Sequence, residues 1–279
     1  MTSRTVRSRP RAAPGGDGLL PRYREALRGL AHAWRRPVDL ERSENRRVLA
    51  SFGTLTLLAV IVGAGVSWDV ELARWAAGLP TEITGFFGRL THLGASGYIF
   101  ALTALAVLAG VGLRGVGLGR RRDAALAVLA ARGFYLFTVA AVSGIASQAL
   151  KHLFGRARPK LIDMVGYLHF DPFTFNATFA SFPSGHAVTA FAMAVGLCYF
   201  MPRLFLPLLA LAGLVAASRV IIGSHYLSDV LFGAALGTAS AVLVRRAFAA
   251  RGIAFHAPTR TIRTRGWRVI ARAIARRGA

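Results

Sequence analysis

The chain has 279 residues, of which 54% are hydrophobic, and it carries 35 lysines and arginines against 12 acidic residues. A soluble domain of this size would lack the polar surface needed to cover so apolar a chain, so the composition indicates a protein of the lipid bilayer. The single cysteine excludes both an intramolecular disulfide framework and a cysteine metal cluster.

The positive charge is concentrated at the two ends of the chain. Residues 1–47 hold 12 arginines against five acids, and residues 245–279 hold ten arginines and no acid. The first of these tails is rich in Arg, Pro and Gly and has no apolar signal-peptide core, so we expect it to be mostly disordered. The predicted domains are a basic tail over 1–47, a membrane domain over 48–244 and a basic tail over 245–279.

Six apolar segments are candidates for membrane-spanning helices, which need about 20 mainly apolar residues. In chain order they are residues 48–66, 98–113, 124–150, 187–201, 204–222 and 226–244. Residues 70–96 read as an interfacial, partly helical connector. The predicted fold class is therefore all-α, a polytopic membrane protein with six transmembrane helices.

Arginines mark one side of this predicted bundle. Six spans place both termini on the same side, together with the arginines that flank the spans: Arg46, Arg47, Arg120, Arg121, Arg122, Arg203, Arg245 and Arg246. The positive-inside rule assigns that side to the cytoplasm. The loop 151–184 and the turn 223–225 should then emerge on the outer face of the plasma (inner) membrane.

Polar residues gather at three places on that outer face, where burial without a purpose would be costly. The first is Lys151 and Arg158, which lie seven positions apart and are followed by Pro159. Seven residues are about two helical turns, so both cations could reach one anion. The alternative is a basic cluster that binds lipid headgroups, which would be expected on the cytoplasmic leaflet instead.

The second place is the run Pro183-Ser184-Gly185-His186 at the start of the fourth predicted span. Proline and serine suit a helix N-terminus, and the free NH groups there can bind a phosphate oxygen. Taken alone, such a run is more often a helix cap with an incidental histidine than a catalytic loop.

The third place is Ser218-Arg219 at the end of the fifth predicted span, followed by His225 and Asp229 at the start of the sixth. The histidine and the aspartate are spaced i, i+4 on one helix face, so the carboxylate can accept the Nδ1 proton and leave Nε2 free to attack. A simple polar contact between helix ends is the alternative. Together, the three clusters form a constellation suited to binding and transferring a phosphoryl group.

These residues match a known tripartite pattern. The chain reads Lys151-x6-Arg158-Pro159, then Pro183-Ser184-Gly185-His186, then Ser218-Arg219-x5-His225-x3-Asp229. This resembles the type 2 phosphatidic acid phosphatase superfamily, the lipid phosphate phosphatases, with every fixed position present in order. The resemblance covers roughly residues 48–244 and leaves the two basic tails outside it.

The resemblance implies a role for each matched residue. His225 is expected to be the nucleophile that forms a phosphohistidine, Asp229 the residue that orients it, and His186 the general acid. The expected phosphate-binding groups are Lys151, Arg158, Arg219, Ser184 and the backbone NH of Gly185. No metal and no cofactor is implied.

The function that the resemblance implies is metal-independent hydrolysis of a lipid phosphate at the outer face of the membrane. Candidate substrates are phosphatidic acid, phosphatidylglycerol phosphate, undecaprenyl pyrophosphate and the lipid A phosphates, with an activity optimum between the apparent pKa values of the two histidines. One alternative is a lipid-to-lipid phosphotransferase that uses the same site. Another is a non-catalytic transporter or binder of anionic lipid.

Three further features complete the expectations. Residues 262–277 read as a basic amphipathic helix on the anionic cytoplasmic leaflet, with no element for nucleic-acid recognition. The phenylalanine-rich stretch 170–182 is either a lipid-facing lip or a packed loop. The other histidines, expected to be structural or exposed, are His32, His92, His152, His169 and His256. The sequence predicts no particular oligomeric state.

Overall fold

The computed structural model of the protein describes residues 19–35, 63, 65–114 and 116–255. The predicted span over 48–66 lies almost wholly outside these residues, and so does the predicted amphipathic helix over 262–277. Neither prediction is tested by the fold.

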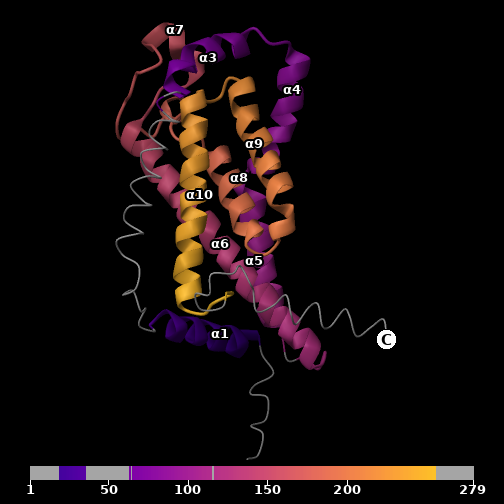
Figure 1. Ribbon diagram of the computed structural model, residues 1–279. Helices are drawn as coiled ribbons and strands as arrows, with labels where there is room; N and C mark the ends of the chain where they lie inside the picture. Colours follow the sequence, from indigo (N-terminus) through magenta and orange to yellow (C-terminus); the bar gives the residue numbers. More distant parts are fainter. Residues whose placement is uncertain (1–18, 36–62, 64, 115, 256–279) are drawn as a thin grey trace, which may run out of the picture.

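All regular elements in the described part of the chain are helices, and this part contains no β-strand (Figure 1). The α-helices are α1 (Leu19–Trp34), α3 (Asp69–Ala77), α4 (Thr81–Leu90), α5 (Ser96–Gly112), α6 (Arg120–Phe154), α7 (Ile162–Val165), α8 (Gly185–Cys198), α9 (Phe205–Ile221) and α10 (Leu227–Ala250). Short 3₁₀ turns lie between them: η1 (Thr91–Gly94), η2 (Pro159–Leu161), η3 (Ala177–Phe179) and η4 (Pro202–Leu204). The all-α prediction is confirmed for this part.

Four stretches are long and apolar enough to cross a membrane: Thr81–Gly112, Arg120–Phe154, Pro202–Ile221 and Leu227–Ala250. They match the second, third, fifth and sixth predicted spans, so the protein is a multi-pass membrane protein. The fourth predicted span forms α8, which is apolar but has only 14 residues. At about 1.5 Å per residue α8 is roughly 21 Å long, less than the ~30 Å of a hydrocarbon core.

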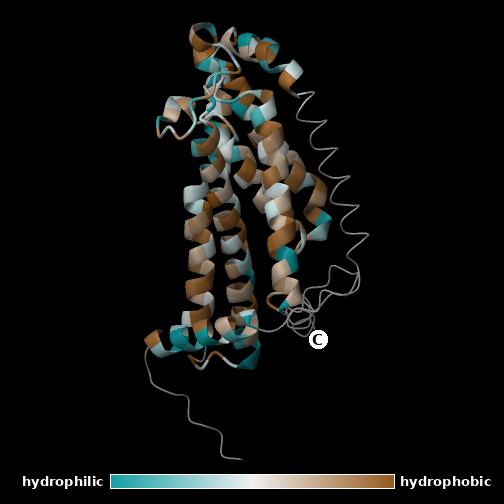
Figure 2. Cartoon of the chain, turned by 90° about the vertical axis from the view of Figure 1, so that its left-hand side faces the viewer, coloured by the Kyte–Doolittle hydropathy of each residue, from teal (hydrophilic) through white to brown (hydrophobic). Residues whose placement is uncertain are grey.

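Small residues allow the helices to approach closely. Helix α10 packs against α8 and α6, and α5 packs along α6. A Cβ atom on Gly237 of α10 would collide with the carbonyl oxygen of Val188 in α8, and one on Gly110 of α5 would lie 2.7 Å from the carbonyl oxygen of Leu126 in α6. Close backbone contact of this kind is a main source of helix association in lipid. Figure 2 shows hydrophobic residues along the middle of the bundle and hydrophilic residues gathered towards its ends.

An aromatic core lies at one end of the bundle. Tyr135 of α6 makes edge-on ring contacts with Phe200, Phe248 and Phe255, at centroid distances of 4.9–5.6 Å. The guanidinium of Arg132, the charged residue inside the third predicted span, stacks over the ring of Phe200 at 4.8 Å. This cation–π contact gives a membrane-embedded cation a favourable protein neighbour.

Helix α1 lies in the basic tail, where the sequence analysis predicts no helix. Residues 1–47 were expected to be mostly disordered, yet Leu19–Trp34 form a helix that lies across one end of the bundle (Figure 1). Arg22 Nη1 donates to the carbonyl of Gly112 at 2.8 Å, and Tyr23 Oη donates to that of Leu108 at 2.8 Å. The carbonyl of Gly112 lies in the last turn of α5, where no helical partner is available, so Arg22 satisfies it and ties α1 to the bundle.

Candidate functional site

The predicted site residues lie at the end of the bundle opposite α1 (Figure 1). The end of α6 carries Lys151, and the chain then turns sharply at Gly155, which has φ +59° and whose NH donates to the carbonyl of Lys151 at 2.8 Å. A Cβ at Gly155 would collide with the carbonyl oxygen of Asp171. Glycine is therefore required there, and the turn places Arg156 and Arg158 beside the end of α6.

Three cations of the site have neutral hydrogen-bond acceptors. Lys151 Nζ donates to the carbonyl of Ala180 at 2.7 Å. Arg158 Nε donates to the carbonyl of Ala177 at 2.8 Å, and Arg219 Nη1 donates to Thr91 Oγ1 at 3.0 Å. Within the described residues none of these three cations forms a salt bridge with a carboxylate. Their charge is therefore available to an anionic ligand.

The N-terminus of α8 lies beside Lys151. Ser184 is the N-cap residue of α8 and is fully buried, and its NH donates to the carbonyl of Asp229 at 3.1 Å. Its Oγ has no hydrogen-bond partner in the part of the chain that the structure describes. A Cβ on Gly185 would lie 3.8 Å from Lys151 Cε. The first two predicted clusters therefore meet, and a buried hydroxyl there still lacks a partner.

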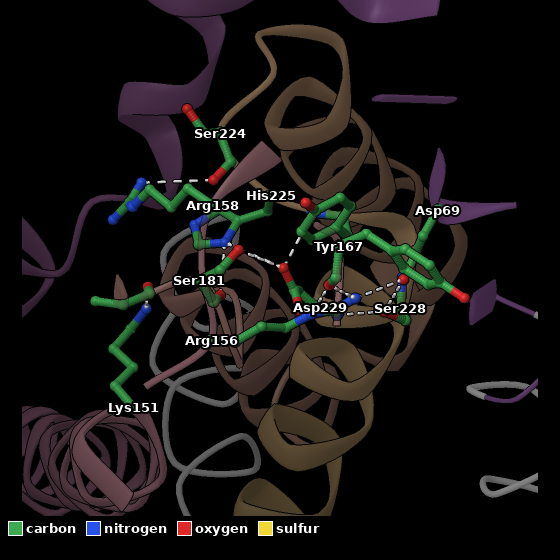
Figure 3. Close-up of polar contacts among 12 residues, drawn as sticks. Asp69, Lys151, Arg156, Arg158, Tyr167, Ser181, Ser224, His225, Ser228 and Asp229 are labelled. Atoms are coloured by element: carbon green, nitrogen blue, oxygen red, sulfur yellow. Dashed lines mark hydrogen bonds and ion pairs between the residues drawn. The ribbon is translucent and has the colours of Figure 1, made fainter. Parts of the chain in front are cut away.

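His225 is held through its Nδ1 atom, which lies 2.7 Å from the carbonyl oxygen of Ser181 (Figure 3). A carbonyl can only accept, so Nδ1 carries the proton and Nε2 keeps its lone pair. The sequence predicted Asp229 as the acceptor, but its Oδ2 lies 3.8 Å from Nδ1, beyond hydrogen-bond distance. The free Nε2 is as expected, whereas the group that sets the tautomer is different.

Burial also fixes the charge of His225. Only 3% of the residue is exposed, and this burial lowers the pKa of its imidazole to about 3 against the opposing influence of Asp229. His225 is therefore neutral at neutral pH, the state in which a histidine can act as a nucleophile.

Besides its direct electrostatic effect, Asp229 contacts Ser181, the residue whose carbonyl holds His225. Its Oδ2 accepts hydrogen bonds from Ser181 Oγ at 2.6 Å and from the NH of Tyr226 at 3.0 Å. The carboxylate thus holds the side chain of the same residue whose carbonyl contacts His225. Because Asp229 is 0% exposed, these donors, together with Arg156, take the place of the water that an ionised carboxylate would otherwise need.

Arg156 and Asp69 complete this buried network, and sequence reasoning missed both. Arg156 Nη1 donates to Asp229 Oδ1 at 2.6 Å, and Nη2 donates to Asp69 Oδ2 at 2.9 Å. Ser228 adds its NH and its Oγ to Asp69 at 2.9 and 2.6 Å. Burial alone would lower the pKa of Arg156, but the two carboxylates reverse this and raise it. One cation between two carboxylates leaves a net negative charge behind His225 (Figure 3).

Signals for these two residues do exist in the sequence. Arg156 stands inside the variable part of the first motif, two positions before Arg158, and Asp69 directly follows an apolar segment. A charged residue beside a membrane span suggests a buried partner. The sequence alone does not identify that partner, because Asp69 and Arg156 are 87 positions apart.

His186 lies in the first turn of α8, and burial, followed by the nearby cations Arg219, Lys151 and Arg158, lowers the pKa of its imidazole to about 4. The turn η1 packs against it, since a Cβ on Gly94 would lie 3.3 Å from His186 Cδ2. The same turn supplies Thr91, the acceptor of Arg219. The sequence analysis places η1 within an interfacial connector over residues 70–96 and gives it no part in the site.

Within residues 19–35, 63, 65–114 and 116–255, no group of three or more His, Cys, Asp or Glu side chains could hold a metal ion. Metal independence itself stays a prediction. What the site offers chemically is a neutral imidazole, a second imidazole, three cations and a helix N-terminus.

Comparison with known proteins gives consistent matches. The sequence profile of the PAP2 superfamily matches residues 132–253. The chain is 35% identical over 177 residues to lipid A 1-phosphatase of Rhizobium etli, covering 63% of this chain and 76% of that protein. It is 33% identical over 202 residues to lipid A 1-phosphatase of Rhizobium johnstonii, covering 72% and 81%.

A Bacillus subtilis protein, phosphatidylglycerophosphatase B, is 30% identical over 168 residues, covering 56% of this chain and 70% of its own. Among solved structures, the transmembrane PAP2-type phosphatidylglycerolphosphate phosphatase of Bacillus subtilis superposes with a TM-score of 0.50 at 23% identity, covering 70% of this chain and 94% of that one. At that identity the structural likeness concerns the fold alone.

Proposed function

The chain belongs to the PAP2 superfamily and is a phosphatase, and we propose that it hydrolyses a lipid phosphate monoester without a metal ion, through a phosphohistidine at His225. The relatives are named for activity on lipid A and on phosphatidylglycerol phosphate, so these two lipids are the foremost candidates. We further propose a bacterial inner membrane as its location, with six spans, cytoplasmic termini and an extracytoplasmic site.

The observation that carries this proposal is a neutral histidine beside three cations that form no salt bridge with any carboxylate among the described residues. Lys151, Arg158 and Arg219 would neutralise the non-bridging phosphate oxygens, with Ser184 Oγ and the NH of Gly185 as further donors. Such a cluster stabilises a phosphoryl group without a divalent ion.

In the first chemical step the Nε2 lone pair of His225 attacks phosphorus, forming the N–P bond as the P–O bond to the lipid breaks. His186, which takes up a proton once the negative phosphate of the bound substrate offsets the cations that lower its pKa, gives that proton to the departing oxygen. The imidazole of His225 gains positive charge in this step, and the net negative Arg156 network behind it favours that change.

In the second step water attacks the phosphohistidine. His186, now neutral, takes a proton from the water while the O–P bond forms and the N–P bond breaks. Free phosphate leaves, His225 Nε2 regains its lone pair, and His186 is again protonated for the next turnover.

The test uses wild type and His225→Asn, purified in detergent with EDTA. We expect the wild type to release phosphate from at least one of phosphatidic acid, phosphatidylglycerol phosphate, undecaprenyl pyrophosphate and lipid A, and His225→Asn to release none, because it lacks the attacking nitrogen. Full dependence on added metal, or equal release by both proteins, would contradict the mechanism. Transfer to an added lipid alcohol in place of release would support the phosphotransferase alternative.

A further inference from the structure

The loop between α6 and α8 exposes an unusual number of large apolar side chains. We name as the apolar loop residues 164–175, whose exposed large apolar members are Met164, Val165, Leu168, Phe170, Phe173 and Phe175. Phe175 is 84% exposed, Met164 79% and Phe173 73%. The apolar loop lies outside every stretch long enough to span the membrane, so the lipid contact that accounts for exposed leucines on the helices does not by itself account for these.

The backbone of the loop is shaped to present these side chains. Phe173 has φ +63°, a conformation that is unfavourable for a bulky residue, and its NH is fixed by the carbonyl of His152 at 2.6 Å. His152 Nδ1 lies 3.0 Å from the carbonyl oxygen of Thr174, and its ring packs on Phe175 at 4.5 Å. Strain that the surrounding contacts maintain often marks a functional surface.

The same contacts tie the apolar loop to the site. Asp171 NH donates to the carbonyl of Gly155 at 2.8 Å, and Ala157 NH donates to that of His169 at 3.0 Å. The loop is therefore bonded to the backbone that carries Arg156 and Arg158. Because these hydrogen bonds join the two segments, the position of the apolar loop helps to set the position of residues 155–158.

The position of the apolar loop relative to the candidate membrane span α6 indicates which part of the bilayer it contacts. Helix α6 is a candidate membrane span up to Phe154, and the hydrogen bonds from Asp171 to Gly155 and from Phe173 to His152 hold the apolar loop beside the end of that span. Side chains that leave the membrane at this point lie at the boundary between acyl chains and headgroups, where exposed apolar groups gain by insertion.

We propose that the apolar loop inserts into the leaflet from which the substrate is drawn, and that this anchoring holds Lys151 and Arg158 at the level of the lipid phosphates. The substrate part of this inference rests on the proposed lipid phosphatase function. The insertion itself does not, so the two can fail separately.

The first test measures insertion without reference to activity. In a Cys198→Ala background, Phe175→Cys and the exposed Lys160→Cys are labelled with an environment-sensitive fluorophore and reconstituted into phosphatidylethanolamine and phosphatidylglycerol vesicles. We expect lipid-borne spin labels to quench the label at 175 and aqueous iodide to quench the label at 160. Quenching of both by iodide alone would overturn the proposal and would leave a protein partner as the neighbour of the loop.

The second test separates anchoring from folding. The double variant Phe173→Ser/Phe175→Ser should raise KM for a lipid phosphate in vesicles at least about tenfold, which corresponds to roughly 1.4 kcal/mol of lost anchoring. Its kcat, and its kcat/KM for a short-chain, water-soluble phosphatidic acid, should stay at wild-type values. Leu27→Ser, an equally polar change at a 65% exposed position of α1, is the matched control and should leave both substrates unaffected.

Equal losses on vesicle and water-soluble substrates would overturn the proposal, because they would show that the phenylalanines only support the packing of the site. If the wild type hydrolyses no lipid at all while the label at 175 is still quenched from the bilayer, insertion stands and the proposed function fails.

Discussion

A histidine with an ordinary pKa of about 6.5 is largely protonated at pH 5.5, whereas burial lowers the pKa of His225 to about 3 and keeps it neutral. The unfolded chain therefore binds a proton at this position that the folded protein does not bind. The stability that depends on neutral His225 is fully present above the unfolded pKa and is lost as pH falls below it. The loss should approach about 1.4 kcal/mol per pH unit.

His225→Asn isolates this effect, because every other titrating group is common to both proteins. The amide of asparagine can still donate to the carbonyl of Ser181, but it does not titrate. Unfolding in detergent between pH 7 and pH 5 should show wild type losing stability relative to His225→Asn. Parallel curves would mean that the imidazole is not held neutral.

The buried acidic residue Asp69 gives a second prediction at the same scale. Asp69→Asn removes one of the two charges that compensate Arg156, which is itself 3% exposed. Arg156 keeps Asp229 as its counter-charge, but the NH2 group of an asparagine would face the donors of Arg156 or Ser228 and lose a charge-assisted hydrogen bond, so we expect a loss of about 2 kcal/mol of unfolding free energy. Asp163→Asn, at an exposed carboxylate, should change the stability little. Similar unfolding of the two variants would contradict the network.

At the scale of elements, the contact between α8 and α10 depends on Gly237. Gly237→Ala adds a methyl group against the Val188 carbonyl and 2.9 Å from the backbone nitrogen of Ala192, so the helices must move apart. We expect a loss of about 1–3 kcal/mol, as for other overpacked interiors. Gly213→Ala in α9 meets no atom within 4 Å and should be neutral or slightly stabilising. Thermal unfolding of both variants in the same detergent makes the comparison.

The long helices could be predicted from the sequence because an uninterrupted apolar run of about 20 residues has few other uses. Helix α8 could be located in the same way, but its 14-residue length could not, since the apolar run Ala187–Met201 extends past the last helical residue, Cys198. Helix α1 was missed because its order comes from contacts with Gly112 and Leu108 of α5, which lie far along the chain.

The same distinction applies to the candidate site, where the sequence predicts some neighbouring residues and not others. Residues within a motif, such as His225 and Asp229, could be placed together from their spacing. Asp69 and Arg156 could not, because hydrogen bonds between distant segments create their proximity. The sequence also could not predict that the carbonyl of Ser181, and not Asp229, accepts the Nδ1 proton of His225. Every residue carries a carbonyl, and no sequence pattern distinguishes this one.

For the whole molecule, the fold separates two ends that the proposal assigns to opposite sides of the membrane. Lys160 is exposed at the end that carries the site, and Arg28 is exposed on α1 at the other end. In a Cys198→Ala background, Lys160→Cys should react with an impermeant maleimide on intact spheroplasts, whereas Arg28→Cys should react only after lysis. The reverse pattern would invert the proposed topology.

The contact between His225 and the main chain has a consequence for genetics. A scan that replaces every residue in turn changes side chains but leaves the backbone oxygen at 181 in place, so it will never score the group that selects the tautomer of the proposed nucleophile. Such a scan will instead register Asp229 and the hydroxyl of Ser181, which fix where that oxygen points. Replacing the amide that contains this oxygen, by protein semisynthesis, would make the contact itself accessible to experiment.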